Sequence, residues 1–161
     1  MVRRRIFFIL MLIWMAVIFS FSCRNGVEST GDSYNVGMAV GRMVVPAFSD
    51  LSADKQLEFA AKVDHPIRKT AHALEYTVLG ICVTGFLYKK DRNWRYNVLF
   101  AWLLGTIYAA SDEFHQLFVP GRSGQLSDVM LDSAGVLLGV LVLSVIFNIL
   151  YNRRTDRSEI Y

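Results

Sequence analysis

The stretch SDEFHQLFVPGRSGQLSD, residues 111–128, separates two long apolar runs, 96–110 and 133–151. It contains three carboxylates, a histidine, an arginine and two glutamines. Ionisable side chains at the edge of a hydrocarbon layer are expensive to bury and usually have a functional reason to be there. The stretch therefore predicts a membrane fold with a polar site at one membrane boundary.

The rest of the chain supports a membrane fold. It is 53% hydrophobic and only 19% charged, which is too apolar for an ordinary soluble domain of 161 residues. Buried helices of a soluble bundle would show polar stripes at helical spacing, but residues 7–21 contain only one serine among apolar residues. We expect one all-α domain over residues 1–161, a polytopic bundle of about four transmembrane helices with an outer helical insertion at about 24–68. The predicted spans, each about as long as a hydrocarbon core of roughly 30 Å requires, are 6–22, 71–88, 96–113 and 133–151.

Clusters of basic residues predict the orientation. They occur at residues 3–5, at 89–95 and after residue 151, where they comprise Arg153, Arg154 and Arg157. By the positive-inside rule these clusters place both termini in the cytoplasm. The net charge of +3 is explained by this orientation, so it does not indicate nucleic acid as a partner. The first run also resembles a signal peptide, but residues 22–24 lack a clear small-x-small cleavage site, which favours an uncleaved anchor.

The outer insertion begins with a polar segment, 24–33, which reads as a loop. Apolar residues at three- and four-residue spacing then predict a short amphipathic helix ending before Pro46. A second short helix is expected at 53–63, with Ser52 as its N-cap. These helices form either a lid over the polar site or part of a mobile loop.

The start of the second span carries a polar stripe. Lys69, His72, Glu75 and Tyr76 are three or four residues apart, so they share one helical face. Because a lipid-facing stripe of this kind would be penalised by several kcal/mol, we expect it to face the bundle interior or a wet cavity.

A second stripe ends the third span. Asp112, His115 and Gln116 share a helical face, whereas Glu113 is expected to point elsewhere. After the break at Pro120 and Gly121, Arg122 falls on a turn. Asp128 and Asp132 follow at the entrance of the last span, where Asp128 is as well suited to helix capping as to function.

The predicted topology brings all these polar groups to the same outer leaflet, in one outward-facing pocket. Histidines and carboxylates there are compatible with a divalent metal or with acid and base catalysis without one, but no spacing matches a strict zinc signature. The cofactor therefore stays open. The expected catalytic residues are His72, Glu75, Asp112, His115 and Asp128. The expected ligand-binding residues are Lys69, Tyr76, Gln116 and Arg122.

Residues 68–80 resemble the Arg-Lys-x-x-His-x-x-Glu-Tyr-x-x-x-Gly pattern of the VanZ-like family of bacterial membrane proteins. Residues 111–139 resemble its Asp-Glu-x-His-Gln-x-Phe-x-Pro-x-Arg stretch with the glycine-bearing span that follows. In one departure, Asp132 stands where the family pattern usually has Asn, and an ionised Asp accepts hydrogen bonds but cannot donate them. The family takes its name from glycopeptide resistance, notably to teicoplanin. The resemblance implies a multi-pass protein of the bacterial cell membrane and a cell-envelope role.

Four functional hypotheses follow. The first is an enzyme that transfers or hydrolyses a group on a lipid-linked envelope precursor or other amphiphile, and the second is a non-catalytic protein that binds a lipid, an antibiotic or such a precursor. A third, an ion or proton relay, is disfavoured because residues 79–87 and 136–150 carry no charge. The fourth is a purely structural role, in which the polar groups hold the helices together.

Overall fold

The computed structural model describes the backbone of residues 2–158 and the side chains of residues 2–151. Within these residues it contains five α-helices, one short 3-10 helix and no strands, which confirms the all-α prediction. The predicted cluster at Arg153, Arg154 and Arg157 lies outside the described side chains. The elements are α1 (Val2–Ser22), α2 (Gly26–Val44), η1 (Phe48–Asp50), α3 (Ala53–Leu87), α4 (Trp94–Gln116) and α5 (Leu126–Ser158).

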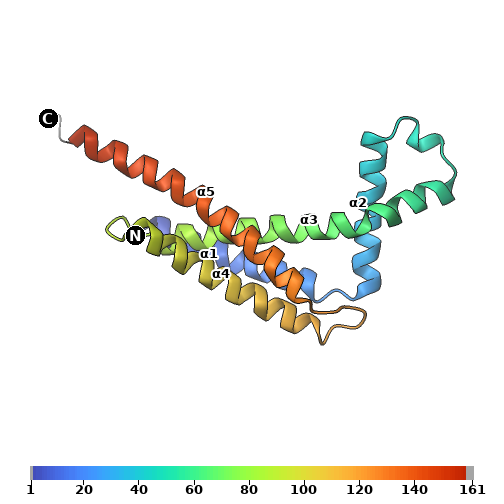
Figure 1. Cartoon of the computed structure of the whole chain (residues 1–161), viewed down its shortest axis with the longest axis horizontal. Coiled ribbons are helices and arrows are strands. Elements are labelled where there is room, and N and C mark those ends of the chain that lie inside the picture. Colours follow the sequence, from blue (N-terminus) through green and yellow to red (C-terminus); the bar gives the residue numbers. More distant parts are fainter. Residues whose placement is uncertain (1, 159–161) are drawn as a thin grey trace.

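Four helices, α1, α3, α4 and α5, run alongside one another, and α2 crosses them at one end (Figure 1). Within the described residues, three helices are long and apolar enough to cross a membrane, namely α1, α3 and α5. The predicted third span, 96–113, lies within α4, which is not among these three helices because polar residues occupy both its ends. Large apolar side chains such as Ile9 and Ile13 are exposed along α1, as expected for a surface that meets lipid.

The two ends of the bundle differ in character. At one end, the Arg3 guanidinium donates hydrogen bonds to the Tyr88 carbonyl (2.7 Å) and the Tyr151 hydroxyl (3.0 Å). This contact joins the start of α1 to the end of α3 and the C-terminal part of α5. The basic residues at 3–5 and 89–95 therefore gather at one end of the bundle, while the polar stretch 111–128 lies at the other (Figure 1).

The insertion differs from the prediction. Residues 26–33, expected to form a loop, belong to the 19-residue helix α2, whose N-terminus is closed by a capping box between Asn25 and Glu28. The expected helix 53–63 is not separate, because α3 continues without a break from Ala53 through Pro66 to Leu87. Ser52 occupies the N-cap position but makes no side-chain capping bond. The polar start of α3 thus extends the second span beyond the apolar core.

α3 and α5 approach each other unusually closely, because glycines stand at their crossing. A Cβ atom added to Gly139 would lie 1.9 Å from the Thr77 carbonyl oxygen, and one added to Gly135 would lie 2.5 Å from the Ala73 oxygen. On α3, a Cβ at Gly80 would lie 2.3 Å from the Val136 oxygen. Small residues of this kind let helix backbones meet within a membrane, where packing rather than water exclusion holds helices together.

We expect Gly139→Ala to lower the free energy of unfolding by about 1–3 kcal/mol, because the added methyl group must push α5 away from the Thr77 carbonyl. The matched control is Gly31→Ala on α2, where an added Cβ meets nothing within 4 Å. Thermal unfolding of both variants in the same detergent measures the difference. Equal stability of the two variants would contradict the close crossing.

Candidate functional site

Two adjoining cavities lie at the end of the bundle where α2 crosses. They have volumes of about 170 and 280 Å³ and share Arg68, His72, Gln116 and Arg122. The first lies among α1, α2, α3 and the end of α4, and its wall includes the apolar side chains Ile18, Phe21, Val36, Ile67 and Ala71. The second lies between α3 and the loop 117–125, and its remaining residues are His65, Lys69, Gly121, Ser123, Gln125 and Asp128.

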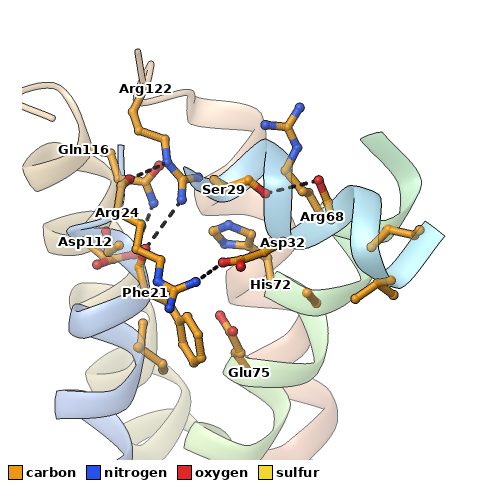
Figure 2. A pocket seen from close by; sticks show the side chains of 16 residues that line it. Phe21, Arg24, Ser29, Asp32, Arg68, His72, Glu75, Asp112, Gln116 and Arg122 are labelled. Carbon is orange, nitrogen blue, oxygen red and sulfur yellow. Dashed lines mark hydrogen bonds and ion pairs between the residues drawn. The ribbon is translucent and has the colours of Figure 1, made fainter. Parts of the chain in front are cut away.

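The polar stripe on α3 faces α5 and the cavities. Lys69 Nζ forms an ion pair with Asp128, and one helical turn further His72 Nδ1 lies 3.6 Å from Asp132 Oδ1. Glu75 lines the first cavity. In Figure 2, His72 lies between Arg122 and Gln116 on one side and Arg68 on the other.

Tyr76, the last member of the predicted stripe, is fully buried in the helix core and does not line either cavity. It packs with Leu79, Val136 and other apolar side chains of the bundle. The structure therefore separates Tyr76 from the ligand-binding residues with which the sequence grouped it.

The end of α4 contributes three buried polar side chains, Asp112, Glu113 and Gln116. Gln116 Nε2 donates a hydrogen bond of 3.4 Å to Asp112 Oδ2, and both residues line the first cavity. Glu113 was expected to point elsewhere, and its Oε2 accepts a hydrogen bond of 3.1 Å from the Gln125 backbone N–H. Glu113 is buried but lines neither cavity, so it turns away from the cavity wall and toward His72 and Asp132.

His115 lies outside the lining of both cavities. Its ring packs 4.9 Å from the Phe19 ring of α1, and its Nε2 lies 3.5 Å from the Cys23 sulfur. His72 is thus the predicted catalytic histidine that the fold brings to the cavities, while His115 supports the packing of α4 on α1.

Arg122 links the loop 117–125 to the end of α1. Its Nε donates to the Arg24 carbonyl (3.2 Å) and its Nη2 to the Phe21 carbonyl (3.5 Å). The loop turns at Gly121, where φ is +74°, a conformation that glycine adopts without strain. Burial lowers the pKa of the Arg122 guanidinium, and nearby Arg68 lowers it further, but an arginine remains charged throughout the physiological range.

α2 forms a wall of the first cavity. Ser33 donates a hydrogen bond to the Asp64 carboxylate, which also pairs with Arg68 at 2.6 Å, and Arg24 pairs with Asp32. Gly37 packs against Ala60 of α3. These contacts favour the lid arrangement of the insertion. Arg24, Asp32 and Ser33 were not predicted as site residues, because their segment, 24–33, was expected to form a loop.

Seven of the predicted site residues meet around the two cavities: Lys69, His72, Glu75, Asp112, Gln116, Arg122 and Asp128. Glu113 and Asp132 line neither cavity, but a carboxylate oxygen of each lies within 4.8 Å of a His72 ring nitrogen. A spacing signal for Glu113 was available, because the buried residues Asn97, Ala101, Gly105 and Ala109 recur every four positions along α4 and Glu113 is next in that row.

Apolar helices long enough to cross a membrane, with a polar cavity at one end of their bundle, define an all-helical membrane protein with a buried ionisable site. A family model described as VanZ/LLP1 matches residues 7–148, nearly the whole chain, and the protein belongs to this VanZ-like family. Comparison with curated proteins and with solved structures found no match.

We expect Lys69→Gln and Asp128→Asn each to lower the free energy of unfolding by about 0.5–1.5 kcal/mol, since both side chains are partly exposed and solvent weakens their attraction. The double variant should have a free energy of unfolding no lower than that of the less stable single variant. A double-mutant cycle from thermal unfolding in detergent measures this coupling. Strictly additive losses would mean that the two groups do not stabilise each other.

Proposed function

We propose that this VanZ-like protein acts on an amphiphile with an anionic headgroup, such as a lipid-linked envelope precursor, and transfers or hydrolyses a group on it. Membership of the family links the chain to teicoplanin resistance, which is consistent with a role in the cell envelope. The observation that carries the proposal is the pair of adjoining cavities, one partly apolar and one lined mainly by polar side chains.

The two cavities match the two parts of an amphiphile. Arg68 and Arg122 line both of them, and Lys69 lines the second, so cationic donors surround the polar space. Guanidinium groups bind phosphate and carboxylate groups through paired N–H donors. The Ile18, Phe21 and Val36 side chains bound the adjoining space, where the first part of a lipid tail would lie.

The depth of the cavities also supports a lipid ligand. The helical rise of about 1.5 Å per residue places His72 about 24 Å along α3 from Tyr88, at the opposite end of the bundle. A hydrocarbon core is about 30 Å thick, so a bundle spanning it would hold His72 just inside the far boundary, where lipid headgroups begin. The positive-inside rule makes that boundary the outer one, with the basic clusters and both termini in the cytoplasm.

Within the cavities, His72 is suited to proton transfer because it lines both spaces and has the Asp132 carboxylate 3.6 Å behind its Nδ1. Glu75 and Asp112 offer a second acid or base in the first cavity. Arg122 would stabilise negative charge that develops on the headgroup.

We expect Arg122→Gln to weaken the binding of a polyprenyl phosphate by roughly tenfold or more, because a charge-assisted hydrogen bond contributes about 1.5–3 kcal/mol. Native mass spectrometry or a lipid-competition assay in detergent measures the affinity. Arg42→Gln, an exposed arginine on the last turn of α2, is the matched control and should bind as the unmodified chain does. The uncharged polyprenol of the same length should bind weakly to every variant, and equal binding of alcohol and phosphate would contradict the proposal.

We expect His72→Gln to abolish turnover of the bound lipid while leaving its affinity nearly unchanged, because the imidazole is assigned to proton transfer rather than to binding. Mass spectrometry of the lipid after incubation in proteoliposomes measures turnover. His115→Gln, which lies outside both cavities, is the matched control. Lipid binding without turnover in the unmodified chain would instead identify a non-catalytic binding protein.

A further inference from the structure

Beneath the cavities, three ionisable side chains from three helices converge. His72 of α3, Glu113 of α4 and Asp132 of α5 each offer one ligand atom, and these atoms all lie within 4.8 Å of one another. The close α3–α5 crossing and the packing of α4 against both helices bring them together. None of the three is adjacent to another in the sequence.

The carboxylates of this cluster are buried but poorly satisfied. Asp132 is 0% exposed, and neither of its oxygens has a hydrogen-bond partner among the described residues. Glu113 is 3% exposed; its Oε2 accepts the Gln125 N–H, while its Oε1 has no such partner in the described part of the chain. His72 Nδ1 is buried too and lies 3.6 Å from Asp132, beyond hydrogen-bonding distance. Buried oxygens without hydrogen-bond partners are costly. The two Asp132 oxygens and Glu113 Oε1 therefore indicate a missing positive partner.

Within the described residues, none of the nearby Lys and Arg side chains pairs with Glu113 or Asp132. Lys69 pairs with Asp128 and Arg68 with Asp64, while Arg122 donates to the carbonyls of Phe21 and Arg24. A divalent cation would neutralise the two carboxylates of the cluster and occupy the otherwise unsatisfied oxygens.

We propose that His72 Nδ1, one oxygen of Glu113 and one oxygen of Asp132 bind a divalent transition-metal ion. Metal–ligand bonds of about 2.1 Å place the ligand atoms of a tetrahedral site about 3.4 Å apart. The three atoms lie within 4.8 Å of one another, so the cluster must contract by about 1 Å to close the site. One imidazole with two carboxylates favours manganese, iron or zinc over calcium, which prefers oxygen ligands alone. The Gln125 N–H, which holds the second Glu113 oxygen, orients that ligand from outside the coordination shell.

The metal lies at the floor of the cavities, since His72 lines both of them. With Nδ1 on the metal, the His72 ring presents its other nitrogen to the cavity as a donor. The proton transfer assigned to His72 is then donation from that nitrogen, and proton acceptance falls to Glu75 or Asp112. The three protein ligands leave coordination positions for water or for an oxygen of the anionic headgroup, which is how a metal polarises a phosphoryl group. The site stands on its own geometry, and its test reads metal content rather than turnover.

The first measurement is the metal content of the full chain, purified in mild detergent without chelator. Elemental analysis should find about one transition-metal ion per chain, as for other sites in which binding and folding are coupled. Removal with a chelator followed by titration with Mn²⁺ should restore one site. Failure to find metal in the purified protein, together with no Mn²⁺ binding on titration, overturns the proposal and leaves protonated carboxylates in its place.

Variants then locate the ion. Glu113→Gln, Asp132→Asn and His72→Gln should each weaken Mn²⁺ binding by more than roughly 100-fold, since even an outer-shell partner contributes about 10–100-fold. The controls Glu58→Gln, an exposed carboxylate on α3, and His115→Gln should leave the affinity unchanged. If Asp132→Asn does not fold, the Glu113 and His72 variants decide. Equal binding in all variants would place the metal elsewhere and refute this site.

Electron paramagnetic resonance adds a signature that a structural role would not produce. Bound Mn²⁺ should show coupling to one imidazole nitrogen, lost in His72→Gln and retained in His115→Gln. Two outcomes distinguish the metal site from the proposed function. If the lipid phosphate still binds after chelation, lipid binding does not depend on the metal. If Mn²⁺ still binds to Arg122→Gln, metal binding does not depend on the headgroup site.

Discussion

The glycine-lined crossing of α3 and α5 is the contact on which the other features of this protein depend. Gly80, Gly135 and Gly139 let the two backbones approach so closely that no side chain fits between them. In lipid, helices gain little from excluding water, so close packing of this kind has to supply much of the association energy. The same crossing fixes the register of α3 against α5 and thereby aligns Lys69 with Asp128 and His72 with Asp132.

This register of α3 against α5 buries ionisable side chains, which costs free energy and points to a functional site. Asp132 is fully buried in a bundle whose long helices are apolar enough to cross a membrane, where a carboxylate without a hydrogen-bond partner is strongly disfavoured. A purely structural role would be better served by hydrogen-bonded partners or by apolar side chains of similar volume. Asp112 Oδ1 and Glu113 Oε1 also have no hydrogen-bond partners in the described structure. The arrangement favours a ligand or cation as the group that completes this network.

Hydropathy predicted the helices well, because a span needs only length and apolar composition. It failed where the chain leaves the hydrocarbon layer. A separate short helix was expected at 53–63, yet α3 runs from Ala53 through Pro66 without a break, since a proline removes one backbone hydrogen bond but need not end a helix supported by tertiary contacts. The first half of α2 was missed because its polar residues resemble a loop, although the Asn25–Glu28 capping box is a helix signal. Helical spacing grouped His115 with Asp112 and Gln116. The buried face of α4 is instead centred on the row that runs from Asn97 to Glu113, and His115 lies at its edge, against α1.

α2 adds a further step, since it partly covers the polar residues at this end of the bundle and forms one wall of the first cavity. Without this helix, His72 and Glu75 would be open at the membrane surface. With it, Ser33 and Asp32 close the first cavity opposite α3, and Val36 supplies part of its apolar wall. Enclosure lowers the local dielectric and strengthens every charge interaction inside. A ligand held there must therefore match the charge of the arginines closely, and a neutral amphiphile of the same shape would leave those groups desolvated without compensation.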